Sequence, residues 1–197
     1  MGNWNEERIR ALSRLYRDYG QGKIDEDIKD LLEMINSLDR YYTTSSCSGR
    51  IQIAEVKYPW RKTEYVILGK WHRPVAIDEV LKCIKRGRRN VWLNVEPPII
   101  HVVAKDLNAA RDMLVLVRQS GFKHSGIQGL REGRILIEVL STDKMEVPLI
   151  FGGQLLFKEE QLETIVCLAN VLLTHGKEKL ARLREALRLK ISHTSFS

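Results

Sequence analysis

The sequence lacks an apolar run long enough to cross a membrane. Its longest candidate, Ile165–Leu173, falls short of the roughly 18 residues that a spanning helix needs and is interrupted by Asn170. The first residues, Met1–Glu7, also lack the basic-then-apolar order of a signal peptide. We therefore expect a protein without membrane contact that works in the cytoplasm.

Cysteine is scarce, and several well-known ligand motifs are absent. Cys47, Cys83 and Cys167 are odd in number and far apart, so they indicate neither a disulfide framework nor a metal-binding pair. The sequence has no HExxH motif and no zinc-ligand spacing, and we expect no metal. It also lacks the GxxxxGK[ST] phosphate loop and the GxGxxG turn, which disfavours a P-loop enzyme and a standard dinucleotide fold.

The residues that are present fit a folded, basic protein. Apolar residues make up 44% of the 197 positions and charged residues 29%, as in globular domains rather than disordered chains. Lysine and arginine total 32 against 25 acidic residues, for a formal charge of +7. This excess favours an anionic partner, most commonly nucleic acid, although solubility alone would also explain it.

Hydrophobic periodicity predicts an α+β fold. Helical spacing favours helices over 3–19, 25–38, 74–87, 106–121 and 159–190, the last broken near Gly176. Alternating residues predict strands over 51–56, 65–70, 91–95, 99–104, around 127, 134–140 and 146–151. We expect one mixed sheet with packed helices in a single domain spanning 1–197. Two strand–helix–strand units, 64–95 and 99–128, suggest an internal duplication.

The densest polar segment is Tyr41–Arg50, which we expect to form a loop before the strand at 51–56. Its consecutive hydroxyl- and thiol-bearing side chains end at the permissive Gly49 and offer several donors to one anionic or polar ligand. Arg50 adds a guanidinium fork suited to phosphate or carboxylate. A turn whose side chains satisfy its own backbone is the alternative.

Two further segments carry residues suited to proton transfer. Pro97–Pro98 stiffens the chain between Glu96 and His101, so the two side chains are candidates to flank one site, with a rigid turn as the equal alternative. The segment 121–126 leaves a helix and enters a strand, where sheet proteins commonly place ligands. There Lys123 is a candidate phosphate ligand and His124 a candidate proton carrier, unless the histidine is merely exposed.

A basic cluster lies between two tryptophans in the sequence. It contains Lys82, Lys85, Arg86, Arg88 and Arg89. Trp71 and Trp92 lie close to it in the sequence. Basic residues interleaved with aromatics suit RNA, because phosphates bind cations and unpaired bases stack on rings. A solvated helix face is the alternative explanation of the cluster.

Three of these segments together resemble one family, the third wybutosine-synthesis protein in its archaeal form. They are YYTTSSCSGR at 41–50, EPPIIHV at 96–102 and GFKHSGI at 121–127. Weaker matches lie at 22–25, at 137–148 and at Ala169–Asn170, so the likeness runs from about residue 20 to 185. The family consists of tRNA-modifying methyltransferases that do not have the typical Rossmann fold.

The resemblance implies a function. It implies S-adenosylmethionine-dependent methylation of N4 in a 4-demethylwyosine-type base beside the anticodon of tRNA(Phe), within wybutosine biosynthesis. As a hypothesis that joins this chemistry to the sequence, His101 or His124 would accept the proton, with Glu96 orienting or assisting. The cofactor or the polar edge of the substrate would contact Ser45, Ser46, Ser48, Gly49 and Arg50. Substrate tRNA would contact Trp71, Trp92, Lys123, Ser125 and the basic cluster at 82–89.

Two other classes of function compete with this one. A non-catalytic RNA-binding module of the same fold would use the hydroxyl-rich segment only structurally. An enzyme that acts on a small molecule without RNA is a weaker rival. Substitution of Ser45, Ser46 and Arg50 separates the first two, because an enzyme would lose turnover while it keeps its affinity for tRNA.

Overall fold

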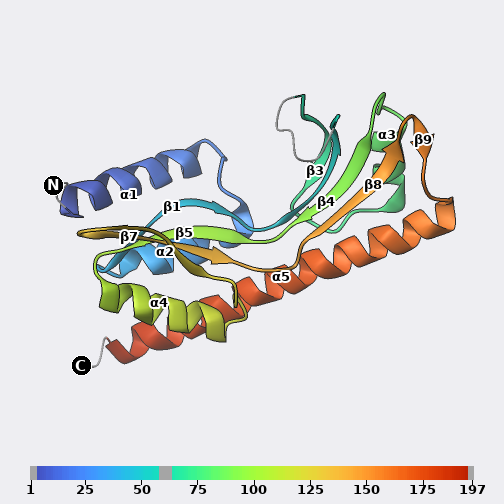
Figure 1. Ribbon diagram of the computed structural model, residues 1–197. Coiled ribbons are helices and arrows are strands. Elements are labelled where there is room, and N and C mark those ends of the chain that lie inside the picture. The colour runs from blue at the N-terminus through green and yellow to red at the C-terminus, as the bar shows by residue number, and fades with distance from the viewer. Residues whose placement is uncertain (1–3, 58–63, 195–197) are drawn as a thin grey trace. The chain divides into compact units, whose positions relative to one another are not determined.

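The computed structural model describes residues 4–57 and 64–194 (Figure 1). The chain divides into two compact units. Unit 1 comprises residues 1–48, 98–142 and 177–197, and unit 2 comprises 49–97 and 143–176. Each unit draws on separate stretches of the chain. The expectation of a single domain over 1–197 stays a prediction.

Unit 1 is built around a four-stranded antiparallel sheet. Its strands, in spatial order, are β1 (Tyr41–Cys47), β5 (Ile99–Ala104), β7 (Arg134–Leu140) and β6 (Gly126–Arg131). Alternate strand residues such as Ile100, Val102 and Ile137 face an apolar core, because successive side chains of a strand point to opposite faces. This core is shared with η1 (Glu26–Ile28), α2 (Lys29–Ser37), α4 (Leu107–Gln119) and the C-terminal part of α5 (Glu159–Thr194). Figure 1 shows α1 (Trp4–Gly20) on the other side of the strands from α4.

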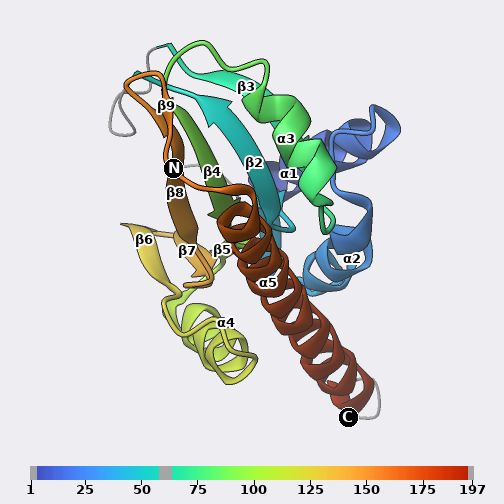
Figure 2. The same cartoon turned by 90° about the vertical axis from the view of Figure 1, so that its right-hand side faces the viewer.

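Unit 2 contains a second antiparallel sheet. Its strands, in spatial order, are β3 (Val66–Trp71), β2 (Arg50–Glu55), β4 (Val91–Glu96), β8 (Met145–Phe151) and β9 (Gln154–Leu155). One face carries the buried side chains of Ile53, Leu93 and Leu149. These pack with α3 (Ile77–Ile84), which runs beside β2 and β3 in Figure 2, and with residues 159–176 of α5. The other face carries the polar side chains of Gln52, Asn94 and Glu96.

The α+β class without a Rossmann fold is confirmed, and three details of the prediction were wrong. The strands form two antiparallel sheets rather than one mixed sheet. Pro97 and Pro98 lie between β4 and β5 and have no N–H to continue a ladder. Residues 41–47 form strand β1 rather than a loop, and α5 continues through Gly176. Leu173 and Leu180 are buried on either side of Gly176, and their burial stabilises the helix by more than the roughly 1 kcal/mol that a glycine inside a helix costs.

The two predicted strand–helix–strand motifs are present. β3–α3–β4 flanks β2, and β5–α4–β6 flanks β7, in each case with the middle strand antiparallel to both neighbours. Whether they arose by duplication stays a prediction. Among the described residues, no helix combines the length and the apolar character that a membrane span requires.

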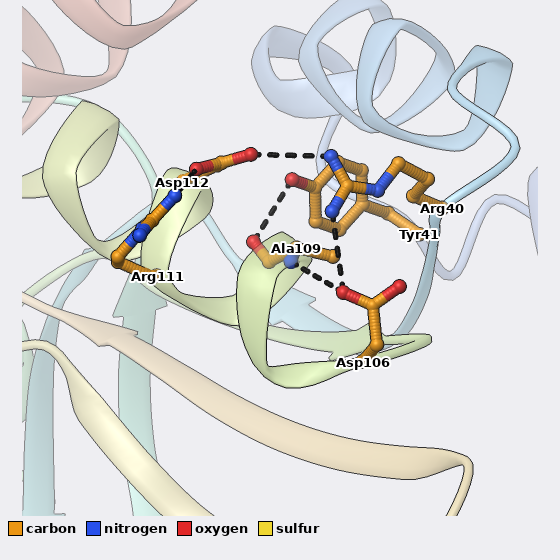
Figure 3. Close-up of polar contacts among 6 residues, drawn as sticks. All are labelled: Arg40, Tyr41, Asp106, Ala109, Arg111 and Asp112. Carbon is orange, nitrogen blue, oxygen red and sulfur yellow. Dashed lines mark hydrogen bonds and ion pairs between the residues drawn. The ribbon is translucent and has the colours of Figure 1, made fainter.

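The start of β1 is tied to the first turn of α4 (Figure 3). The Asp106 carboxylate accepts a 2.7 Å hydrogen bond from the Ala109 amide, which confirms Asp106 as the predicted helix cap. Arg40 contacts the carboxylates of Asp106 and Asp112 at 3.2 and 3.1 Å. The Tyr41 hydroxyl donates to the Ala109 carbonyl at 2.9 Å. Chiefly through the Ala109 amide, and also through Arg40, these contacts lower the pKa of Asp106.

We expect Asp106→Ala to lower the free energy of unfolding by about 1 kcal/mol at pH 7, as measured by urea denaturation. A carboxyl group whose pKa is lower in the folded state stabilises the fold above its unfolded pKa, roughly 4, and loses that effect as the pH falls through the folded value. The difference between the wild type and the variant should therefore shrink at acidic pH. Asp39→Ala, at a highly exposed carboxylate, is the control and should have little effect. A difference that stays constant down to pH 2 would contradict this assignment.

Candidate functional site

Three polar side chains form a row across the sheet of unit 1, which we call the Ser–His–Glu row. The strand register places Ser45 of β1 opposite His101 of β5, and His101 opposite Glu138 of β7. Ser45 Oγ lies 2.6 Å from His101 Nδ1, and His101 Nε2 lies 3.3 Å from Glu138 Oε1. The side chains of His101 and Glu138 are 27% and 21% exposed, so solvent reaches both. The row lies on the face away from the apolar core.

Two β-bulges set the geometry of this row. The pairing of β1 with β5 shifts between Thr43 and Ser45, which leaves Thr44 as the extra residue. In a regular ladder Thr44 would lie opposite His101, so the bulge is what brings Ser45 to the histidine. A second shift in β6 leaves Gln128 as the extra residue, and its Nε2 donates to Glu138 Oε2 at 3.2 Å.

The hydrogen bonds of the row define how it can carry a proton. A carboxylate only accepts hydrogen bonds, so the ring nitrogen that contacts Glu138 is the one that carries hydrogen in the neutral imidazole. Nδ1 then accepts the hydroxyl hydrogen of Ser45. The arrangement can take up a proton at Nδ1, and the neighbouring carboxylate stabilises the imidazolium that forms.

A cavity of about 220 Å³ adjoins the row. It lies between α1 and β1, entirely within unit 1, and Ser45 contributes to both the cavity and the row. Arg8 holds α1 in place by donating to the Asn36 carbonyl at 2.6 Å, and Tyr42 donates to the Glu7 carboxylate at 3.0 Å. The lining of the cavity combines charged, hydroxyl-bearing and apolar side chains, chiefly Arg10, Arg14, Asp18, Leu15, Thr44 and Ser46.

The remaining residues of the hydroxyl-rich segment take other positions. Ser48 is fully buried; its amide donates to Asp25 at 2.8 Å and its hydroxyl accepts from Lys177 at 3.0 Å. Gly49 has a φ of +89°, which favours glycine, and its carbonyl lies 3.0 Å from a ring nitrogen of His72. Arg50 opens β2 in unit 2, so the structure describes it in a different unit from Ser45 and Ser46.

The segment at 121–127 presents only part of its predicted site to solvent. Lys123 and His124 are exposed in the turn between α4 and β6. Ser125 is buried, where its hydroxyl donates to the Phe122 carbonyl at 2.8 Å and accepts from the Leu140 amide at 3.2 Å. Ser125 therefore fastens this turn to the end of β7.

Glu96 belongs to the polar face of unit 2, where it lies opposite Arg50. On the same face Gln52 and Asn94 are buried, and both amide groups donate to the Tyr65 hydroxyl, Asn94 at 3.3 Å. Burial raises the pKa of Tyr65 above its ordinary value. Since Glu96 and His101 belong to different units, the expectation that they flank one site stays a prediction.

The predicted RNA-binding residues of unit 2 are divided between surfaces. Trp71 lines an open groove together with Lys82, Lys85 and Arg86. Its ring lies against Gly69, where a Cβ would overlap it. Arg88 and Arg89 are exposed beyond the end of α3, and Arg89 pairs with Glu64. Trp92 alternates with the core residues of β4, so it belongs to the opposite face of the sheet.

Sequence reasoning missed several residues of the site. Glu138 stands between the buried Ile137 and Val139, and a carboxylate inside the otherwise apolar run 135–140 was the available signal. Gln128 reaches Glu138 only through a bulge, which the sequence does not mark. In the sequence, the charged residues that α1 contributes to the cavity have the pattern of an ordinary solvent-exposed helix face.

The buried carboxamide of Asn36 anchors β1 just before its bulge. Its oxygen accepts from the Thr43 amide at 2.9 Å, and its nitrogen donates to Thr43 Oγ1 at 2.8 Å and to the Leu32 carbonyl at 2.6 Å. Removal of this group leaves buried polar atoms of β1 without partners.

We expect Asn36→Ala to lower the free energy of unfolding by about 1–3 kcal/mol, because a buried group that loses its partner bears its desolvation cost. Chemical denaturation followed by circular dichroism measures this. Ser37→Ala, at the exposed neighbouring position, is the matched control and should shift the midpoint little. Equal midpoints for the two variants would show that the Asn36 contacts do not anchor β1.

Comparison with known proteins extends these observations. Residues 6–189 match the family model described as methyltransferase TYW3. A Pyrococcus furiosus protein named tRNA(Phe) 7-((3-amino-3-carboxypropyl)-4-demethylwyosine(37)-N(4))-methyltransferase 1 is 43% identical over 182 residues, covering 92% of this chain and 93% of that protein. A protein of the same name from Thermococcus kodakarensis is 41% identical over 186 residues, covering 94% of each. The solved PH1069 protein from Pyrococcus horikoshii superposes with a TM-score of 0.91 at 40% identity, covering 94% of this chain and 96% of that one.

Proposed function

Because this chain belongs to the methyltransferase TYW3 family, we propose that it transfers a methyl group from S-adenosylmethionine to N4 of a 4-demethylwyosine-type base in tRNA(Phe). The base lies next to the anticodon, and the reaction is a step of wybutosine biosynthesis. One observation carries the proposal: a Ser–His–Glu row suited to accepting a proton borders a cavity in a chain whose relatives are named N4-methyltransferases. A tRNA substrate is consistent with a cytoplasmic protein.

The reaction requires both a proton acceptor and well-placed ligands. S-Adenosylmethionine supplies the methyl group as a sulfonium; as N4 bonds to the methyl carbon, the C–S electron pair stays on sulfur and N4 loses a proton. His101 would accept this proton at Nδ1, directly or through the Ser45 hydroxyl, while Glu138 stabilises the imidazolium. The cavity suits part of such a ligand, because its wall combines apolar side chains with hydroxyl and charged groups.

The other predicted residues have supporting roles in this proposal. Ser45 and Ser46 line the cavity and would contact the ligand, while Ser48 and Gly49 shape the turn that follows β1. Arg50 and Glu96, which lie opposite each other in unit 2, stay candidates for polar contacts with a ligand. The groove formed by Trp71, Lys82, Lys85 and Arg86 would bind the tRNA backbone, with Lys123, Arg88, Arg89 and Trp92 as further contacts.

The direct test is to incubate the protein with S-adenosylmethionine and tRNA(Phe) that carries the demethylated base. The mass of the released nucleoside should increase by that of one methylene unit, since CH3 replaces H on N4. Binding of the tRNA without any mass change would favour the alternative, a non-catalytic RNA-binding module.

We expect His101→Asn to lower kcat by about 10²- to 10⁴-fold, because the variant has no proton acceptor beside Ser45. Glu138→Gln should lower kcat less, since the imidazole stays but its cation is less stabilised. The matched control is His124→Asn, which removes an exposed histidine outside the row. Single-turnover assays measure all three, and a large loss in His124→Asn with His101→Asn unaffected would move the base to the other histidine.

We expect Lys82→Ala to weaken tRNA binding and to reduce the slope of log K against log salt concentration by about 0.7–0.9, the effect of one lost phosphate contact. Lys158→Ala removes an equally exposed lysine of unit 2 that does not line the groove, and it should leave the slope unchanged. Titrations of labelled tRNA at several salt concentrations give the slopes. The same slope for both variants would exclude the groove as a phosphate-binding surface.

A further inference from the structure

The cavity beside Ser45 has both signs of charge on one wall. Arg10, Arg14 and Asp18 follow one another at intervals of four residues along α1, so their side chains lie on one side of the helix. The ion pairs within this helix are loose: Arg14 lies 3.7 Å from Asp18, and Arg10 lies 4.0 Å from Glu6. The side chains of Arg10 and Arg14 are each 70% exposed, and their guanidinium groups can form a closer, bidentate pair with an incoming carboxylate.

From this geometry we infer that the cavity binds an α-amino-acid end group, that is, an ammonium and a carboxylate on one carbon. The Arg14 guanidinium, with Arg10 beside it, would hold the carboxylate, and Asp18 would hold the ammonium. Apolar contacts with Leu15 and Ile24 suit the short methylene chain that follows such a group. No neutral or purely anionic ligand would use both signs of charge.

The size of the cavity agrees with an end group rather than a whole cofactor. At about 220 Å³ it is smaller than the roughly 300–1,000 Å³ of pockets that enclose a complete ligand. The hydroxyl-bearing Ser45 and Ser46 form its wall on the β1 side, and Ser45 also contacts His101. An end group held here leaves the rest of its molecule beside the proton acceptor.

Two ligands of the proposed reaction carry this end group, and in naming them the inference rests on the proposed function. One is S-adenosylmethionine, whose methionine portion ends in an ammonium and a carboxylate. The other is the base itself, when it carries the 3-amino-3-carboxypropyl chain that the names of the relatives specify. Binding measurements distinguish the two sources without depending on turnover.

The test uses Arg14→Ala and Asp18→Asn in the full chain, with Arg17→Ala as the matched control. Arg17 is exposed on the same helix and does not line the cavity, so its substitution removes the same charge elsewhere. Calorimetry would measure the Kd of S-adenosylmethionine and of tRNA(Phe) that carries the demethylated base with or without the aminocarboxypropyl chain. Thermal unfolding would verify that each variant is folded.

We expect Arg14→Ala to weaken one of these ligands by about tenfold to a hundredfold, Asp18→Asn to weaken the same ligand, and Arg17→Ala to weaken neither. If the variants lose affinity for S-adenosylmethionine but not for its decarboxylated analogue, the cavity is assigned to the cofactor. If they lose affinity only for the tRNA that carries the aminocarboxypropyl chain, the cavity is assigned to the substrate. Unchanged affinities in the cavity variants, an equal loss in Arg17→Ala, or a wild type that binds none of these ligands would overturn the inference.

These outcomes are separate from the fate of the proposed function. A wild type that binds one of the ligands through Arg14 and yet leaves the nucleoside mass unchanged would refute methyl transfer and support the cavity assignment. A wild type that methylates the tRNA while Arg14→Ala and Asp18→Asn keep full affinity for every ligand would support methyl transfer and refute the cavity assignment.

Discussion

The two hydrogen bonds between Asn36 and Thr43 fix the strand on which the site of unit 1 depends. β1 lies at the edge of its sheet and carries few apolar side chains, so burial alone specifies its register weakly. The Asn36 carboxamide fixes Thr43 from α2, and the Tyr41 hydroxyl fixes the start of the strand on α4. The bulge at Thr44 begins directly after this anchor, and it carries Ser45 to His101.

Rigid strands hold the Ser–His–Glu row more firmly than loops would. Each of its three side chains comes from a different strand of one ladder, and the flanking residues of β5 and β7 are buried in the apolar core. Strand alternation then directs the polar side chains to the opposite face without further support. Gln128 completes the row by donating to Glu138, which fixes the carboxylate against the imidazole.

The sequence predicts this fold well where apolar residues alternate or recur, and less well where polar contacts decide. Strands such as β5 and β7 and the capped helix α4 follow from periodicity and from Asp106. β1 was mistaken for a loop because hydroxyl side chains mimic turn composition, whereas its pairing with β5 supplies the hydrogen bonds. His101 was a candidate from its motif, whereas Glu138 was not predicted, since their contact depends on the register between strands far apart in the sequence.

The position of α1 adds a constraint of a different kind. Its N-terminal part is fixed to β1 and α2 by Arg8, which donates to the carbonyls of Tyr41 and Asn36, and to β1 by Glu7, which accepts from Tyr42. Leu15 is buried farther along the helix, while Arg10 and Arg14 stay exposed along the cavity. The contacts of Glu7 and Arg8 thus hold the helix, and Arg10 and Arg14 can present charge without contributing much to stability. Because Ser45 lines the cavity and contacts His101, a ligand anchored on α1 would be oriented by the same strand that positions the proposed proton acceptor, and such prior orientation is what a methyl transfer needs.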